Sequence, residues 1–347
     1  MQIDGVEIED TFAEAFAMVA ARAIITADSA DWATTAAREA TGYATSVIAC
    51  DAEAGVEREL APDETPDGRP GASVLFFGFS RDKLEKAVAN RIGQCVMTCA
   101  TTACYNGVDQ LDKPIKIGGS LRYFGDGFQT SKLLEQPLAD SRQPSAVGNQ
   151  PSTTPKEVVV QAARLRLPLT TLQAGRLHYA NDQQSSRRRF WRVPVMDGEF
   201  LCEDKFGTVK GVAGGNFLIL ASTPRAALAA AERAVAAIRQ SVRDVILPFP
   251  GGVVRSGSKV GSRYKKLRAS TNDGYCPTLR GVTATSLPEG VAAVYEIVID
   301  GLSLAAVEAA TRVGVRAACL PGVVRISAGN YGGNLGPHHI RLHDVLK

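Results

Sequence analysis

The sequence predicts an α+β protein built from two lobes in tandem. Three observations support this fold class: apolar runs rich in β-branched and aromatic residues, Ala- and Leu-rich stretches of helical length between them, and four occurrences of this strand–helix–strand pattern. Two such units in succession form the split β-α-β arrangement of ferredoxin-like folds, an antiparallel sheet with both helices on one face. We therefore expect ferredoxin-like α/β sandwich lobes at about 1–130 and 190–347.

The N-terminal lobe contains the first two units. Ser80 marks the start of its second helix, because a serine hydroxyl accepts a hydrogen bond from an otherwise unpaired backbone N–H of the first turn. The expected elements are strand 22–28, helix 31–41, strand 45–50, strand 73–79, a helix that begins after Ser80, and strand 94–98.

The C-terminal lobe contains the other two units. Thr223 and Pro224 mark a helix start, since threonine is a good N-cap and proline fits the first helical position. The expected elements are strand 215–221, helix 224–240, strand 244–247, strand 292–299, a helix that begins after Ser303, and strand 323–327.

Residues 131–189 separate the lobes and differ from them in composition. Repeated Pro, Ser and Gln are typical of a mobile loop or linker, and we interpret the segment as a variable linker. It ends in the basic cluster 187–189. This cluster is either a contact for an acidic partner or a solvated loop end, and the surface preference of arginine favours the loop end.

Charge and hydropathy exclude several classes of protein. The 39 basic and 36 acidic side chains leave a net charge of +3. A protein that binds nucleic acid mainly through electrostatic attraction usually has a larger excess of basic residues. No apolar run approaches the roughly 20 residues that cross a bilayer, and the acidic start does not resemble a signal peptide. We expect a soluble cytoplasmic protein with neither nucleic acid nor membrane as a partner.

Neither the cysteines nor the histidines predict a metal site. Seven cysteines, an odd number without an export signal, are expected to be reduced thiols. The spacing of the three cysteines within 95–104 matches no zinc or iron–sulfur signature. Residues 337–343 alternate like a strand, with Ile340 and Leu342 on one face and His339 and His343 on the outer face.

Glycine-rich stretches concentrate in the C-terminal lobe, at 211–216, 248–262 and 327–336. Glycine lets the backbone approach a ligand closely, so we expect these loops to line a shared cleft. The second stretch is not a phosphate-binding P-loop. In that motif lysine directly follows the glycine, whereas here Ser258 comes before Lys259.

One carboxylate interrupts an apolar strand, at Glu296. A dry environment raises the pKa of a carboxyl group, which suits it to acid/base catalysis near neutral pH. The alternative is a residue of an edge strand that faces water. The sequence does not decide between the two.

Long strings of the chain resemble one family, the formylmethanofuran:tetrahydromethanopterin formyltransferases. The strings are 4–16, 64–71, 91–98, 124–127, 212–216, 248–262, 269–278, 295–299 and 327–330. The resemblance implies transfer of a formyl group between the amine of methanofuran and N5 of tetrahydromethanopterin, with no tightly bound cofactor. It also implies a homodimer or homotetramer. Stretches 104–121 and 280–288 resemble bacterial members, which work within a formyltransferase/hydrolase complex during formaldehyde oxidation to formate.

The same resemblance implies the site. Glu296 matches the catalytic glutamate proposed for the family. The substrate-binding candidates are Arg255, Ser258, Lys259, Asn272, Asp273, Tyr275, Gly329 and Asn330. Arg255 and Lys259 suit the acidic glutamyl tail of methanofuran. Asn334 stands where the family usually has lysine, which puts an anion contact there in doubt.

We expect direct transfer in a ternary complex, because Cys276 has no histidine near it in sequence to activate it as a nucleophile. Two alternatives remain open. One is a non-catalytic formyltransferase-like scaffold within the complex, and the other is a formyltransferase that acts on a folate-type carrier.

Overall fold

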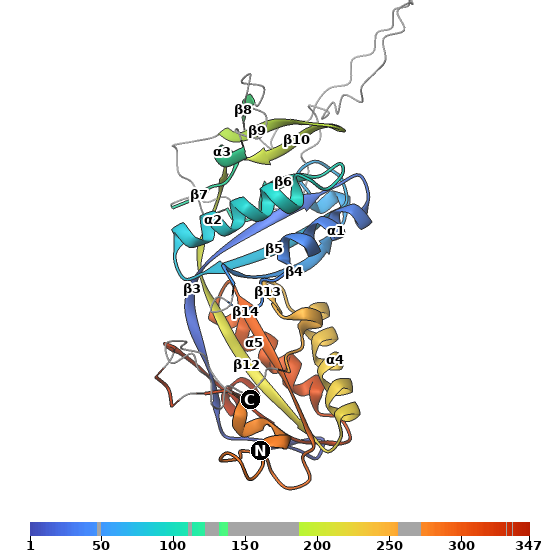
Figure 1. Cartoon of the computed structure of the whole chain (residues 1–347), viewed down its shortest axis with the longest axis vertical. Coiled ribbons are helices and arrows are strands. Elements are labelled where there is room, and N and C mark those ends of the chain that lie inside the picture. Colours follow the sequence, from blue (N-terminus) through green and yellow to red (C-terminus); the bar gives the residue numbers. More distant parts are fainter. Residues whose placement is uncertain are drawn as a thin grey trace, which may run out of the picture.

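Two long strands run through both halves of the molecule and join them (Figure 1). The computed structural model describes residues 1–46, 50–109, 113–121, 132–137, 187–255, 272–330, 332–334 and 336–347. Strand β3 (Phe12–Thr26) pairs antiparallel with β12 (Val209–Ala221). This pairing joins the strands of the two halves into one large branched sheet. A second, small sheet in the described residues has two strands.

The N-terminal half consists of two consecutive strand–helix–strand units. Its elements are β3, α1 (Ala30–Thr41), β4 (Glu53–Leu60), β5 (Gly71–Gly78), α2 (Arg81–Arg91) and β6 (Ala103–Asn106). The strand order is β6-β3-β5-β4, and each of these neighbours is antiparallel.

The C-terminal half repeats this plan. Its elements are β12, α4 (Pro224–Ser241), β13 (Val245–Ile246), β14 (Ala293–Gly301), α5 (Leu304–Ala318) and β15 (Val323–Ser327). The strand order is β15-β12-β14-β13, again antiparallel throughout.

The sheet continues beyond both halves, and there it is mixed. Next to β6 lie β10 (Gly198–Glu203), β9 (Arg187–Val195) and β8 (Lys132–Pro137), and β6 is parallel to β10. Next to β15 lie β2 (Val6–Ile8), also parallel, and β1 (Gln2–Ile3). The sequence predicts antiparallel sheets only, and that prediction is wrong at these added strands, which cover what would otherwise be exposed edges.

Several short elements complete the chain. They are β7 (Ile115–Lys116), β11 (Lys205–Phe206), β16 (His338–Arg341), α3 (Gly118–Leu121), α6 (Leu342–Val345), single 3₁₀ turns at Pro62–Glu64, Pro250–Gly252, Asp273–Tyr275 and Pro277–Leu279, and a π-helical turn at Ile92–Val96. No helix in the described parts of the chain is long and apolar enough to cross a bilayer.

The helix starts follow local rules that the sequence makes visible. The side chains of Ser80, Thr223 and Ser303 each accept a hydrogen bond from the backbone three residues on, which confirms the predicted caps. The predicted strand 323–327 is confirmed at both ends.

Three predictions about local structure need correction or lie partly outside the described residues. The predicted strand 94–98 is wrong: the chain there continues α2 as a π-helical turn, which buries Ile92 and Val96 on one face. The cluster 187–189 is not a loop end, because it opens β9, and Arg188 donates to Glu203 at 3.0 Å. Residues 47–49 of the predicted strand 45–50 are not described, and the next strand begins at Glu53.

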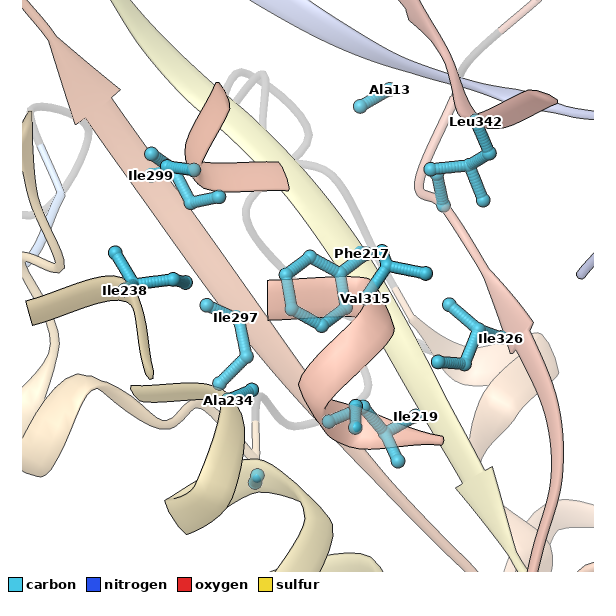
Figure 2. Packing of buried hydrophobic residues seen from close by; sticks show 14 of the residues in the cluster. Ala13, Phe217, Ile219, Ala234, Ile238, Ile297, Ile299, Val315, Ile326 and Leu342 are labelled. Atoms are coloured by element: carbon cyan, nitrogen blue, oxygen red, sulfur yellow. The ribbon is translucent and has the colours of Figure 1, made fainter. Parts of the chain in front are cut away.

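A hydrophobic core lies between the helices and the sheet in each half. In the C-terminal half, Phe217, Ile297, Ile299 and Val315 belong to one buried cluster with Ala234 and Ile238 of α4 (Figure 2). The core of the N-terminal half also takes in four residues from β9, β10 and β11, namely Val193, Phe200, Cys202 and Phe206. The segment 190–206, which the sequence places in the C-terminal lobe, therefore packs with the N-terminal half.

Candidate functional site

The candidate site lies on the face of the C-terminal sheet that α4 and α5 leave open. Side chains alternate along a strand, so Phe217 and Ile219 face the helices whereas Leu218 faces the other way. Leu218 pairs with Glu296 on one side and with Ser327 on the other. These three residues therefore form one row across β14, β12 and β15 on the open face.

Glu296 does not lie on an edge of the sheet. On its second side, β14 exchanges two backbone hydrogen bonds with Val254, at 2.8 and 2.9 Å. The side chain is half-buried and lines a cavity of about 400 Å³. The edge-strand alternative is thus excluded for this residue.

A turn at 272–276 crosses above the row and contacts both of its ends. Asn272 Nδ2 donates to Glu296 Oε2 at 3.0 Å. The 3₁₀ turn that follows is closed by Tyr275 N–H donating to Asn272 O at 3.0 Å. The Tyr275 hydroxyl lies 3.3 Å from Ser327 Oγ. The turn therefore ties β14 to β15 over Leu218 and forms a wall of the cavity.

The cavity has both apolar and polar lining residues. Leu218, Val254 and Val294 contribute apolar side chains, whereas Arg255, Asn272 and Glu296 supply charge and hydrogen-bonding groups. Arg255 is exposed, which leaves its guanidinium accessible to solvent.

Cys276 also lines the cavity, and its thiol donates to Asn272 O at 3.3 Å. Burial, and to a lesser extent the Asp273 carboxylate, raises the pKa of this thiol. A protonated thiol is a poor nucleophile, so the environment of Cys276 does not favour a covalent formyl-enzyme.

Gly329 and Asn330 lie in the loop after β15, and they are not part of the cavity wall. The Gly329 N–H donates to Asn216 Oδ1 at 2.7 Å, and Asn330 Nδ2 donates to Thr11 Oγ1 at 2.8 Å. Farther along the loop, Gly333 N–H donates to Glu14, which is buried. The loop is therefore anchored to β12 and to the start of β3.

The structure brings together four of the candidate residues: Arg255, Asn272, Tyr275 and Glu296 all line the cavity. Asp273 lies in the same turn. Ser258 and Lys259 lie outside the described residues. Asn334 is exposed, and its amide donates to Gly332 O at 3.1 Å.

Sequence reasoning missed two polar residues of the open face, Asn216 and Ser327. Both are buried, at 7% and 1% exposure. The available signal was a polar residue in an otherwise apolar strand, the same signal that identified Glu296. It becomes informative only when the pairing register places these residues on one face.

Another cavity, of about 520 Å³, lies in the N-terminal half beside Cys50, Arg91 and Cys95. The Arg91 guanidinium there already donates to Asp51 at 2.6 Å and to the carbonyls of Ala40 and Gly42. Its charged group therefore serves the fold, and we do not assign chemistry to this cavity.

Among the described residues no group of three or more His, Cys, Asp or Glu side chains could hold a metal ion. The strand predicted at 337–343 is confirmed at His338–Arg341, where Ile340 is buried and His339 is exposed. The prediction is wrong beyond Arg341, because Leu342, which is also buried, begins the short helix α6.

Comparison with known proteins gives the family. The model described as formylmethanofuran-tetrahydromethanopterin formyltransferase matches residues 1–138, and the one described as its proximal lobe matches residues 198–345. The chain belongs to this formyltransferase family. A formylmethanofuran–tetrahydromethanopterin formyltransferase of Methylobacillus flagellatus is 48% identical, with both chains covered completely. One component of the formyltransferase/hydrolase complex of Methylorubrum extorquens is 46% identical over 99% of this chain and 97% of its own length.

Solved structures agree with this assignment. The formyltransferase/hydrolase complex of Methylorubrum extorquens with methylofuran contains a chain that is 44% identical and superposes with a TM-score of 0.81, covering 100% of this chain and 99% of that one. The formyltransferase of Methanosarcina barkeri gives a TM-score of 0.78 at 42% identity, covering 99% and 100%. The mixed α/β fold with one large sheet is therefore shared with this family.

Proposed function

We propose that the protein transfers a formyl group between formylmethanofuran and N5 of tetrahydromethanopterin. The observation that carries this proposal is the position of Glu296, which lines a cavity of about 400 Å³ on the open face of the sheet and accepts a hydrogen bond from Asn272. The family membership of the whole chain supports the choice of carriers.

The reaction exchanges one amide C–N bond for another. The acceptor amine attacks the formyl carbon, the carbonyl electron pair moves onto oxygen, and the donor amine leaves when the oxyanion collapses. The proton that the attacking nitrogen loses ends on the departing nitrogen. The protein must therefore hold two carriers in line, stabilise the oxyanion and move one proton.

We assign to Glu296 the transfer of the proton from the attacking nitrogen to the departing nitrogen. Asn272 orients its carboxyl group through the hydrogen bond to Oε2, and Tyr275 holds the turn that carries Asn272. Arg255, together with Ser258 and Lys259, is assigned to the acidic tail of methanofuran. Asp273, Gly329 and Asn330 complete the set of binding residues. The protonated thiol of Cys276 favours direct transfer within a ternary complex.

We infer the assembly and the pathway from the relatives and from the family resemblance. A relative at 46% identity is one component of a formyltransferase/hydrolase complex, which supports the same assembly here. Within it we propose a homodimer or homotetramer, as the resemblance implies. In that setting the reaction runs towards formylmethanofuran during formaldehyde oxidation in the cytoplasm.

For the domain organisation we propose two ferredoxin-like lobes, 1–130 and 190–347, joined by the variable segment 131–189. The strand orders β6-β3-β5-β4 and β15-β12-β14-β13 support this division. Within this division, residues of β9 and β10 pack against the core of the first lobe.

The test is formyl transfer from formylmethanofuran to tetrahydromethanopterin by the purified protein, with Glu296→Gln beside it. Glutamine keeps an acceptor for Asn272 but cannot exchange a proton, so we expect turnover to fall about 100-fold or more while both carriers still bind. Glu289→Gln, the same change at an exposed position before β14, is the matched control.

Three outcomes would contradict the proposal. Full activity of Glu296→Gln would remove the glutamate from the mechanism. Turnover with tetrahydrofolate and none with tetrahydromethanopterin would favour a folate-type carrier. No activity of the wild type, alone or with the other components of the formyltransferase/hydrolase complex, would leave a scaffold role.

A further inference from the structure

Asn216 occupies the row next to Glu296 on the open face of the sheet. Glu296 pairs with Leu218, and Asn216 pairs with Val298, two residues along each strand. Two residues of a strand span about 7 Å, and diagonal neighbours on adjacent strands lie about 7–8 Å apart. Asn216 is not among the residues that line the cavity. It lies one row beyond Glu296, within reach of a group that Glu296 also contacts.

The orientation of the Asn216 amide is fixed by its partner. A backbone N–H can only donate, so the atom that receives the Gly329 N–H at 2.7 Å is the oxygen Oδ1. The nitrogen Nδ2 therefore points away from that bond and carries two N–H groups. No described residue accepts a hydrogen bond from it.

Asn216 is buried, with 7% of its surface exposed. Its Nδ2 is not among the described buried atoms that lack a hydrogen-bond partner, so solvent reaches this donor. Other buried polar groups nearby have partners, such as Glu14 with Gly333. An amide that keeps its donors unpaired in this position is suited to an acceptor that arrives with a ligand.

Gly329 leaves room for such an acceptor. A Cβ atom at this position would lie 3.1 Å from Asn216 Nδ2, closer than ordinary contact. Any side chain larger than hydrogen would thus crowd the donor. The absence of a side chain at Gly329 therefore keeps that side of the donor uncrowded.

We propose that Asn216 Nδ2 donates a hydrogen bond to the formyl oxygen during transfer, which makes Asn216 a second catalytic residue beside Glu296. This proposal rests on the formyl transfer proposed above. When the acceptor amine forms its bond to the formyl carbon, the carbonyl electron pair moves onto the oxygen, and the bond from Asn216 strengthens as charge grows there. The old C–N bond then breaks, and the departing amine takes the proton that the attacking nitrogen has lost.

A neutral amide suits this role. It donates a hydrogen bond without gaining or losing a proton, so Glu296 alone carries out the proton transfer. The hydrogen bond from Gly329 fixes the orientation of the Asn216 amide before the reaction. The amide therefore does not have to reorient when negative charge develops on the formyl oxygen, and such preorganised donors stabilise the transition state most.

The decisive variant is Asn216→Asp. An ionised aspartate at 216 keeps an oxygen for the Gly329 N–H but has neither of the two amide donors. We expect the melting temperature and the binding of both carriers, measured by calorimetry, to stay near wild type, and kcat to fall about 10²- to 10³-fold. Asn90→Asp, the same change at an exposed position of α2, is the control and should leave all three unchanged.

A second variant covers the case in which Asn216→Asp folds poorly. Gly329→Ala keeps the amide and places a methyl group against Nδ2, and we expect kcat to fall about tenfold or more at an unchanged melting temperature. The proposal is overturned if either folded variant keeps kcat within about twofold of wild type, or if only KM rises. An inactive wild type would instead overturn the proposed function itself.

Discussion

The two halves of the chain share one strand order but use their open sheet faces differently. In the N-terminal half, Glu57 accepts from Arg22 Nε and Nη2, from the Ser73 hydroxyl and from the backbone N–H of Asp244, at 2.6–2.9 Å. In the C-terminal half, Glu296 accepts from the neutral amide of Asn272 beside a cavity. A carboxylate surrounded by donors and a cation stabilises the contact between the halves. The Glu296 carboxyl group lines a cavity, where a ligand can contact it.

The contrast extends to the neighbouring polar groups. In the N-terminal half, Asp67 accepts from Thr26, Arg69 and Tyr105. In the C-terminal half, the Asn216 amide keeps two donors unpaired by any described residue. The same strand order thus carries a closed hydrogen-bond network in one half, whereas in the other half it carries the cavity to which we assign the ligands.

The largest effect should come from removing Glu57. Glu57→Ala leaves the Arg22 guanidinium, 20% exposed, without its main partner, and we expect about 3–5 kcal/mol of lost stability in chemical denaturation. The turnover of the protein that remains folded should not change. Glu64→Ala, which breaks an exposed pair with Arg58, is the control and should cost less than about 1 kcal/mol. A loss of turnover in folded Glu57→Ala would contradict the division between the halves.

A smaller effect is expected from replacing an asparagine in each half, and the two replacements should change different quantities. Asn272→Ala removes the donor to Glu296, and we expect kcat to fall about tenfold with little change in melting temperature. Asn106→Ala in the N-terminal half removes an acceptor for the N–H groups of Val108 and Gly207 and should lower the melting temperature alone. The same response from both variants would show that Asn272 is only structural.

The smallest effect concerns pH at the contact between the halves. Asp300 is buried and faces Glu53 of β4, and Gly214 N–H of β12 donates to it. Burial, and then the Glu53 carboxyl, raise the pKa of Asp300 well above its ordinary value, against the opposing effect of the Gly214 N–H. The folded state therefore binds this proton more tightly than the unfolded state. Its contribution to stability is complete below the ordinary carboxyl range and is lost as pH rises towards the folded-state pKa.

Asp300→Asn cannot lose that proton. The difference in melting temperature between Asp300→Asn and wild type should increase in favour of the variant as pH rises from about 4 to about 8. Asp63→Asn, at an exposed position, should show a constant difference. A constant difference for Asp300→Asn as well would mean that this carboxyl is already ionised in the folded protein.

Local chemistry made much of the fold predictable. The caps at Ser80, Thr223 and Ser303 and the strand 323–327 depend on a few neighbouring residues, and the structure has all of them. The run 94–98 misled because Val96 is buried on a helical turn rather than in a strand. The joining of both halves into one sheet depends on the pairing of β3 with β12, which are far apart in sequence.

The site was predictable only in part, for the same reason. An isolated carboxylate in an apolar strand identified Glu296, and resemblance supplied Asn272 and Tyr275. The row of Ser327, Leu218 and Glu296 depends on the register of three strands, and so does the place of Asn216 beside it. No local pattern contains that register.

The most direct test of the account compares Glu296→Gln with Glu57→Gln in two measurements, single-turnover formyl transfer and thermal unfolding. We expect Glu296→Gln to lose transfer about 100-fold or more at an unchanged melting temperature, and Glu57→Gln to melt earlier with transfer intact. Transfer near the wild-type rate in Glu296→Gln would contradict the central claim that this carboxyl group performs the chemistry.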